Sequence, residues 1–225
     1  MRPSASLVLT PMTSPLWSSD GVFLVQVRED IIVLDANADH YACLIDAAGW
    51  LVARPDGRLQ VADGTSARAL ISAGLAQREP PARPRRIMVP PARELTSLPV
   101  ATATQIVRAG VQIAAATLAF RGRTLPMLLR SDREAASRPS STASPQLAQS
   151  VAAFRAALPW LPLEGECLQR AFQLRRVLMS RGAHVDWIFG VRTWPFAAHC
   201  WLQIGDTVVG DSLSRVTGYT PIMAT

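Results

Sequence analysis

Apolar and polar positions near the start of the chain follow a pattern that is typical of short β-strands. Three runs rich in β-branched and other apolar residues share it: "VFLVQV" (22–27), "IIVLDA" (31–36) and "HYACLI" (40–45). Helical patterns follow over about 47–54 and 66–73, and they end at two breakers, Pro55 and Gly74. The pattern therefore predicts three strands followed by two short helices.

A stretch rich in proline and arginine, residues 80–92, separates this unit from the rest of the chain, and its composition predicts an extended linker. A helical pattern over about 94–120 comes next, and the Ser/Pro-rich stretch at 131–145 is typical of an exposed loop. The last 80 residues predict a pair of helices followed by strands. We expect four parts: an N-terminal extension (1–20), a unit of strands and helices (21–80), a linker (81–93) and an α+β domain (94–225).

One of the late helices begins with a cysteine. In "EGECLQRAFQLRRVLMSRG" positions 167, 171, 174 and 178 form one apolar stripe at helical spacing, and a glycine ends the segment. Cys167 therefore falls in the first turn, where the helix dipole and free backbone N–H groups favour a thiolate, whereas Glu164 and Glu166 oppose it. Cys167 is a candidate nucleophile, although the helix alone also fits a buried, inert cysteine.

A candidate base and its partner lie in the predicted hairpin over 197–211, which turns at "GD". A plain two-residue turn pairs His199 with Ser212 and places Asp211 on the other face, so their contact requires a three-residue loop or a bulge. Given that contact, Asp211 orients the imidazole and His199 deprotonates Cys167. The alternative is a core histidine that is hydrogen-bonded to the backbone.

Other uses of these residue types are less favoured. His40 and His184 lack an equally suitable acidic partner. A zinc site could be drawn from four side chains: Cys167, His199, Cys200 and Asp211. Because neighbours in a strand point to opposite faces, His199 and Cys200 should not share a metal, and we expect none. Cys43 and Cys200 are expected to have no chemical role.

Composition excludes several kinds of function. The net charge is +6 and the chain contains no lysine. This excludes enzymes that bind phosphate through a P-loop lysine, form a Schiff base on lysine or use lysine as a general base. The arginines are scattered rather than gathered, so no nucleic-acid partner is expected.

Three scattered cysteines indicate a reducing cytosol, which predicts a cytoplasmic protein. No signal peptide is recognised, and the apolar run "VQIAAATLAF" is short of the roughly 20 residues that span a bilayer, so no membrane partner is expected.

The order of Cys, His and Asp resembles that of papain-like and transglutaminase-like folds, and the segment from Cys167 to Asp211 resembles the leader peptidases of lasso-peptide biosynthesis, the B proteins. The most specific part is GVR-x-x-PF-x-x-H-x-W, here Gly190 to Trp201. The resemblance implies a cysteine protease, a hydrolase in the biosynthesis of ribosomally made, modified peptides (RiPPs). It would cleave the bond between the leader of the precursor peptide and the core that becomes the product. The resemblance gives Cys167 the role of nucleophile, His199 that of general base and Asp211 that of orienting acid.

The front of the chain is similar to the leader-peptide recognition element of ribosomal-peptide pathways, a three-stranded sheet on a winged-helix-like helical bundle. "RLQVADGT" is short for its middle helix. The resemblance implies that the leader adds a strand to the sheet, and an edge strand offers free backbone groups for it. The residues expected there are His40, Tyr41, Ala42, Cys43 and Leu44.

The resemblance also implies partners: the lasso precursor peptide and an asparagine-synthetase-like lasso cyclase that uses ATP. The chemistry itself requires no cofactor. The resemblance leaves ATP dependence open, although the chain has no P-loop. Two other functions stay open. One is acyl transfer to an amine, as in transglutaminases, because the same three residues serve both reactions. The other is a non-catalytic chaperone that binds the leader.

Overall fold

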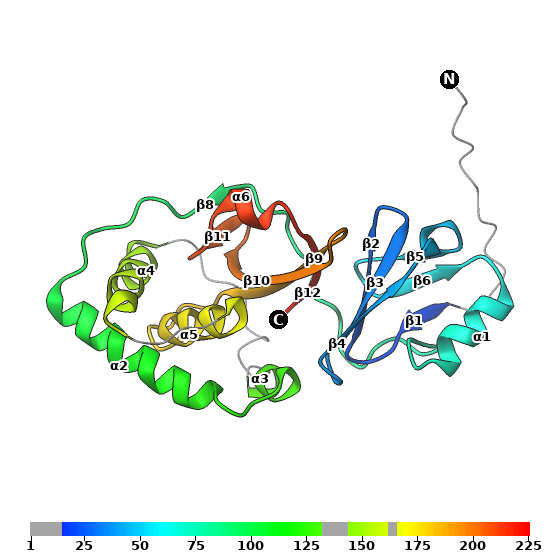
Figure 1. The fold of residues 1–225 in the computed structure, drawn as a ribbon, viewed down its shortest axis with the longest axis horizontal. Coiled ribbons are helices and arrows are strands. Elements are labelled where there is room, and N and C mark those ends of the chain that lie inside the picture. Colours follow the sequence, from blue (N-terminus) through cyan, green and yellow to red (C-terminus); the bar gives the residue numbers. More distant parts are fainter. Residues whose placement is uncertain (1–14, 132–143, 162–165) are drawn as a thin grey trace, which may run out of the picture. The chain divides into compact units, whose positions relative to one another are not determined.

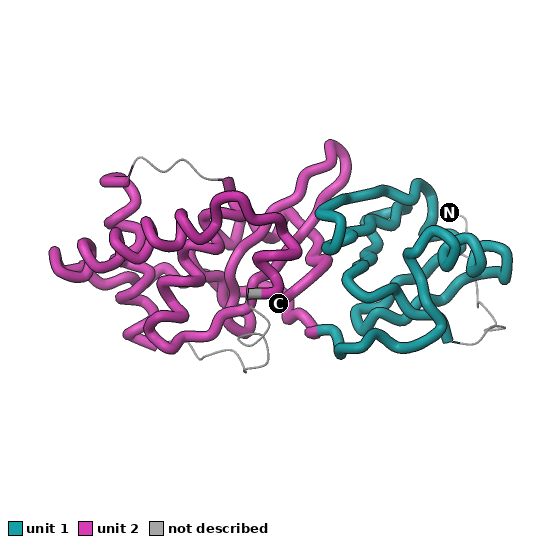
Figure 2. Tube along the Cα trace, turned by 90° about the horizontal axis from the view of Figure 1, so that it is seen from below, with its two compact units in different colours: residues 1–85 teal, residues 86–225 magenta. Residues whose placement is uncertain are grey.

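The computed structural model describes residues 15–131, 144–161 and 166–225. The chain divides into two compact units, Met1–Arg85 and Arg86–Thr225, which Figure 2 shows in different colours. The boundary falls within the proline- and arginine-rich stretch.

Unit 1 contains the three strands expected from the first apolar runs. They form an antiparallel sheet in the order β2 (Val22–Val27), β3 (Asp30–Asp35), β4 (His40–Leu44) (Figure 1). The central strand β3 is almost wholly buried, and one face of the sheet contributes Leu24, Ile31 and Val33 to an apolar core. The prediction of three strands is therefore confirmed. The strand β4 ends the sheet.

A second sheet in unit 1 takes the place of helices that the sequence analysis expected. Its order is β5 (Leu51–Ala53), β6 (Arg58–Val61), β1 (Leu16–Ser18), β7 (Ala76–Gln77). The helix expected over 47–54 is wrong: a 3-10 turn, η1 (Ala47–Gly49), leads into β5. The physical reason is cross-strand pairing, because Leu51 and Leu59 in β5 and β6 are both buried in the same core.

The second expected helix is confirmed as α1 (Gly64–Ser72). The carboxylate of Asp63 caps it by accepting hydrogen bonds from the backbone N–H groups of Thr65 and Ser66 at 2.8 and 2.9 Å. Residues 15–85 of the structure contain this one α-helix, so the helical bundle expected by resemblance is replaced by a second sheet. The strand β1 lies in the segment expected to be an extension, and it pairs with β6 and β7.

Unit 2 is built on a five-stranded sheet. The strand order is β12 (Thr220–Ala224), β9 (Asp186–Arg192), β10 (Ala197–Ile204), β11 (Thr207–Val209), β8 (Arg93–Glu94). All neighbours are antiparallel except β11 and β8, which are parallel. The middle of the sheet is buried, with the indoles of Trp187 and Trp201 almost fully enclosed.

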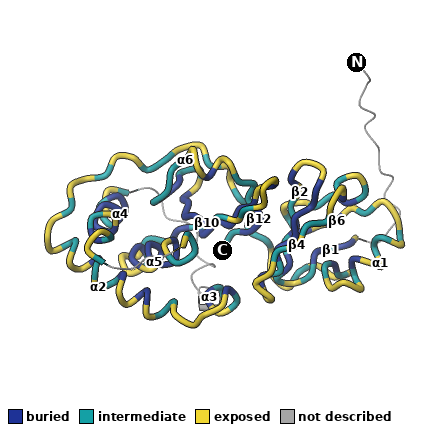
Figure 3. The backbone as a smooth tube through the Cα atoms, viewed as in Figure 1, coloured by how far each residue is buried: buried dark blue, intermediate teal, exposed yellow. Residues whose placement is uncertain are grey.

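Helices cover this sheet in layers (Figures 1 and 3). The helix α5 (Cys167–Met179) packs against β10, and α2 (Ala103–Phe120) and α4 (Pro145–Ala157) pack against α5. The expected helix pair near the end of the chain is confirmed as α4 and α5. The described part of unit 2 also contains three shorter helices: α3 (Leu125–Ser131), η2 (Leu158–Trp160) and α6 (Leu213–Val216).

Two boundaries in unit 2 differ from the expected ones. The helix α2 begins at Ala103 rather than near residue 94, because Thr102 and Gln105 form a capping box that fixes its first turn. Most of the Ser/Pro-rich loop, residues 132–143, lies outside the described residues. No helix in the described part of the chain combines the length and apolar character needed to cross a membrane.

The second half of the expected linker belongs to unit 2. The guanidinium of Arg86 forms an ion pair with Asp186 at 2.6 Å, and the carbonyl of Val89 accepts a hydrogen bond from the Gln203 amide at 2.7 Å. Residues 86–92 belong to no helix or strand; they contact the sheet through these two interactions and lead directly into β8.

Candidate active site

The helix α5 presents Cys167 at its first position. Its apolar face is buried through Ala171, Leu174 and Leu178, so the helix is held firmly against its neighbours. Glu166 is the N-cap residue but makes no side-chain cap, and Glu164 lies outside the described residues. Cys167 is half-buried, as expected for a side chain that reaches a cavity from the start of a helix.

The strand β10 presents His199 to the same place. Its imidazole stacks on the Trp201 indole at 6.1 Å between ring centroids and lies tilted against the Tyr219 ring at 5.2 Å. Directly across the strand pair is Gly190. A Cβ atom there would lie 2.7 Å from the Trp201 ring and 3.0 Å from Tyr219. Glycine at this position therefore lets the two aromatic side chains pack closely beside the histidine.

Asp211 reaches His199 by a route that the sequence analysis did not foresee. The hairpin has the plain register, with Ile204 paired with Thr207, so the predicted three-residue loop or bulge is wrong. Instead β11 ends at Val209, and Gly210 adopts a φ of +81°, which turns the chain out of the strand. The Asp211 carboxylate then lies 2.6 Å from Nε2 of His199.

The neighbourhood holds the Asp211 carboxylate in place. The backbone N–H of Ser212 donates to its second oxygen at 2.7 Å, and the exposed Arg215 lies 3.7 Å away. Glu94, in β8, accepts a hydrogen bond from the backbone N–H of Leu213 at 2.8 Å, which ties the start of α6 to the sheet. The short segment after Gly210 is therefore fixed at both ends.

Contacts within the site shift the pKa values of Cys167 and His199 in opposite directions. A hydrogen bond from the Cys200 thiol, with another from His199, lowers the pKa of Cys167 to about 4, although burial opposes the change. The hydrogen bond to Asp211, followed by that to Cys167, raises the pKa of His199 to about 9. Burial raises the pKa of Asp211, but the hydrogen bonds from His199 and Ser212 outweigh it and the net shift is downward. At neutral pH the pair is a thiolate and an imidazolium.

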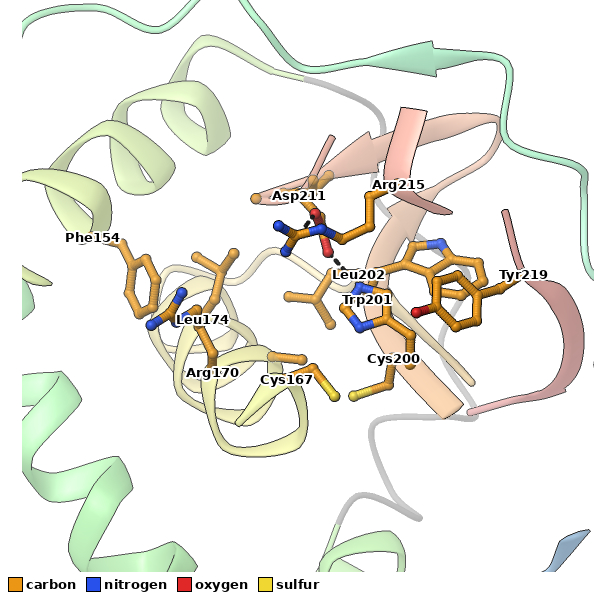
Figure 4. A pocket seen from close by; sticks show the side chains of 14 residues that line it. Phe154, Cys167, Arg170, Leu174, Cys200, Trp201, Leu202, Asp211, Arg215 and Tyr219 are labelled. Atoms are coloured by element: carbon orange, nitrogen blue, oxygen red, sulfur yellow. Dashed lines mark hydrogen bonds and ion pairs between the residues drawn. The ribbon is translucent and has the colours of Figure 1, made fainter. Parts of the chain in front are cut away.

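A cavity of about 320 Å³ opens beside this pair (Figure 4). The helix α5 lines it with Cys167, Arg170 and Leu174, α4 adds Phe154, and His199 and Asp211 line it from β10 and the segment after β11. Because Nε2 of His199 is bonded to Asp211, Nδ1 is the ring nitrogen that serves Cys167. An ionised thiol, a proton donor and an adjacent cavity are together equipped for nucleophilic attack on a carbonyl group.

Comparison with known proteins places this arrangement in a family. The model of the transglutaminase-like superfamily matches residues 107–224, more than half of the chain. The chain belongs to the transglutaminase-like superfamily. It is a mixed α+β protein whose superfamily domain includes all three residues of the Cys167–His199–Asp211 site.

A partial match connects this superfamily member with one curated protein. It is 37% identical over 49 residues to the microcin J25-processing protein McjB of Escherichia coli. The match covers 22% of this chain and 24% of McjB, so the chain matches only about a quarter of that relative's length. No solved structure matches the chain.

The side chain of Cys200 points in a direction that the sequence did not predict. It is buried, with 4% of its surface exposed, as expected, but its sulfur points toward that of Cys167 rather than away from the site (Figure 4). The cavity is lined by both His199 and Cys200, and the helix that begins with Cys167 packs against their strand. The expectation that Cys200 points to the face opposite the site is therefore wrong, whereas the expectation that it does not carry the chemistry stays a prediction. The sequence signal for this contact was the adjacent pair His199–Cys200, which follows a helix that begins with Cys167.

The remaining predicted residues lie elsewhere. His40, Tyr41, Ala42, Cys43 and Leu44 form β4 of unit 1. Burial and the neighbouring Asp30 raise the pKa of the Cys43 thiol, the opposite of the shift at Cys167. Among residues 15–131, 144–161 and 166–225, no three His, Cys, Asp or Glu side chains are grouped so that they could hold a metal ion.

Proposed function

We propose that this protein is a cysteine peptidase that cleaves the leader from the core of a ribosomally made lasso-peptide precursor. The observation that carries the proposal is the 2.6 Å contact between His199 and Asp211 beside a cysteine at the start of α5. Membership of the transglutaminase-like superfamily supports a cysteine-based acyl reaction. The partial match to a protein named for processing microcin J25 supports a peptide precursor as substrate.

The proposed reaction follows from the charges of the pair. The Cys167 thiolate attacks the carbonyl carbon of the scissile bond, and the backbone N–H of Cys167 is one donor available to the resulting oxyanion. The His199 imidazolium gives its proton to the leaving amine, which frees the core and leaves the leader as a thioester on Cys167. His199 then takes a proton from water, whose oxygen attacks the thioester and releases the leader as a carboxylic acid.

The leader is proposed to bind at β4 of unit 1. This strand ends its sheet, so its edge away from β3 pairs with no other strand of the described chain. His40 and Ala42 are exposed, whereas Leu44 packs against the apolar core and keeps the strand fixed. A fixed strand with an open edge is suited to adding an extended peptide through backbone hydrogen bonds.

Backbone methylation of the leader tests this mode of binding. In an antiparallel or parallel pair, only every second residue of an added strand directs its N–H toward the neighbour. We expect N-methylation at alternate leader positions to weaken binding about tenfold or more per lost hydrogen bond, and methylation one residue along to leave it nearly unchanged. Isothermal titration with the Cys167→Ala protein measures both without cleavage. Equal losses at adjacent positions would contradict strand addition.

The proposal includes two partners and no essential cofactor. The freed core amine is the group that a separate ATP-using, asparagine-synthetase-like cyclase would join to a core carboxylate. Nothing in the cleavage reaction itself consumes ATP, and the side chains that carry out the steps above are all in this chain. Any effect of ATP would therefore act through binding or through the cyclase. A cytoplasmic location would bring enzyme, precursor and cyclase together.

Product analysis tests the proposed function. The purified protein and its precursor peptide are incubated in water enriched in heavy oxygen, with and without an added primary amine. We expect a leader fragment whose new carboxylate carries the heavy oxygen, together with a core that has a free amino terminus. A leader fragment joined to the amine would indicate acyl transfer instead. Leader binding without any cleavage would support the chaperone function.

A further inference from the structure

We infer that Cys167 and Cys200 form a reversible oxidation site that takes hydrogen peroxide and closes into a disulfide. The oxidation lies outside the proposed peptidase reaction, in which Cys200 hydrogen-bonds to the Cys167 thiolate but forms and breaks no covalent bond. It does not depend on what the protein cleaves.

The geometry of the two cysteines supports the inference. Cys167 begins α5 and Cys200 lies in β10, and these two elements pack against each other. Figure 4 shows the two sulfur atoms facing each other at the inner end of the cavity. Both are free thiols in this structure. The two thiols lie within hydrogen-bonding reach of each other, so a disulfide between them would link the start of α5 to β10.

Accessibility decides which sulfur reacts first. Cys167 is half-buried and lines the cavity, whereas Cys200 is 4% exposed. Hydrogen bonding favours the thiolate form of Cys167, and the hydrogen bond to that thiolate, followed by burial, raises the pKa of Cys200. The more accessible thiolate of Cys167 is therefore the attacking group, and the buried thiol of Cys200 is the resolving one.

The chemistry balances in two steps. The Cys167 thiolate attacks one peroxide oxygen, so that an S–O bond forms and the O–O bond breaks. The hydroxide that leaves takes a proton from the His199 imidazolium and becomes water. Cys167 is then a neutral sulfenic acid, so the negative charge that kept Cys200 protonated has gone. Cys200 gives its proton to His199 and attacks the Cys167 sulfur; an S–S bond forms, the S–O bond breaks, and hydroxide leaves as water with that proton. Two thiols and one peroxide become one disulfide and two waters.

The consequence is protection of the more reactive cysteine. Without a second thiol, a sulfenic acid is oxidised further to a sulfinic acid, which ordinary thiols do not reduce. With Cys200 beside it, Cys167 is stored as a disulfide that a dithiol reductant restores. Oxidised protein is inactive in any reaction that needs the Cys167 thiolate, and it regains activity on reduction.

Mass spectrometry of the full chain tests the inference directly. Reduced protein is treated with equimolar hydrogen peroxide, quenched with N-ethylmaleimide and digested with trypsin. We expect peptides 156–170 and 193–215, which contain Cys167 and Cys200, to be joined with the loss of two hydrogens. Dithiothreitol should separate them and restore both thiols. The Cys43→Ala protein, as a matched control, should give the same linked pair.

A second variant distinguishes protection from chance pairing. Peroxide should convert Cys167 of the Cys200→Ala protein to the sulfinic acid, with a gain of two oxygens that dithiothreitol does not reverse. If the alanine variant does not fold, Cys200→Ser takes its place, because serine has nearly the same side-chain volume, and the same sulfinic acid is expected. The inference is overturned if the wild-type chain forms the sulfinic acid as readily as these variants. It is also overturned if the disulfide joins Cys43 or a second molecule.

Discussion

Cys167→Ala is expected to reduce cleavage of the precursor by about 10⁴- to 10⁶-fold while leaving leader affinity unchanged. Removing the nucleophile of a cooperating triad costs roughly as much as removing all three members, because the remaining two have nothing to activate. The side chain is half-buried at the edge of a cavity, so its loss should cost little stability. Single-turnover cleavage, followed by mass spectrometry, measures the first quantity, and titration with the leader measures the second.

The matched control for this variant is Cys43→Ala. Cys43 lies in β4 of unit 1, and the pKa of its thiol is raised by burial and by Asp30, so it is expected to be unreactive. Its replacement should leave the rate of the chemical step unchanged. Full cleavage by a folded Cys167→Ala protein would rule out the cysteine mechanism.

Asp211→Asn is expected to reduce kcat/KM by about 10⁴-fold, as the corresponding change does in serine peptidases, with the fold intact. The Asp211 carboxylate accepts a hydrogen bond from Nε2 of His199 at 2.6 Å and stabilises the imidazolium. An amide in its place can donate to Nε2, which favours the tautomer whose proton is on Nδ1, facing Cys167. That tautomer cannot accept the thiol proton, so the pKa of His199 should fall and that of Cys167 should rise.

Asp206→Asn provides the control on the same hairpin. Asp206 is in the turn and forms a two-pronged ion pair with Arg93 at 2.7 and 3.1 Å, well away from the imidazole. Because Arg93 is largely exposed and solvent screens the pair, its loss should change stability little and cleavage not at all. If Asp211→Asn retains wild-type kcat/KM, the aspartate has no part in the reaction.

Much of the site could be predicted from sequence because it depends on strong local signals. The apolar stripe at helical spacing placed Cys167 at the start of α5, and the "GD" turn placed His199 in a hairpin strand. The contact with Asp211 depends on something less visible. Gly210 leaves the strand at a φ of +81°, and a Cβ atom there would lie 2.3 Å from the Leu174 side chain. A turn that is imposed by packing between distant segments has no local pattern.

The N-terminal unit was predicted less completely, for a similar reason. Strands β2 to β4 have consecutive apolar runs and were found within about one residue. The two- to four-residue strands β1, β5, β6 and β7 are too short to establish a period of their own. They exist because they pair with one another around a shared core, and tertiary pairing overrides weak local preference.

The pH dependence of Cys167 alkylation is the most direct test of the central claim, that hydrogen bonds from Cys200 and from a protonated His199 hold this cysteine as a thiolate. The wild-type chain is treated with iodoacetamide at each pH, and labelling of tryptic peptide 156–170 is followed. Because only the thiolate reacts, the rate should rise through the Cys167 pKa of about 4 and stay nearly level until His199 loses its proton at about pH 9. A single rise near the ordinary thiol pKa, with slow labelling at pH 6, would contradict the account.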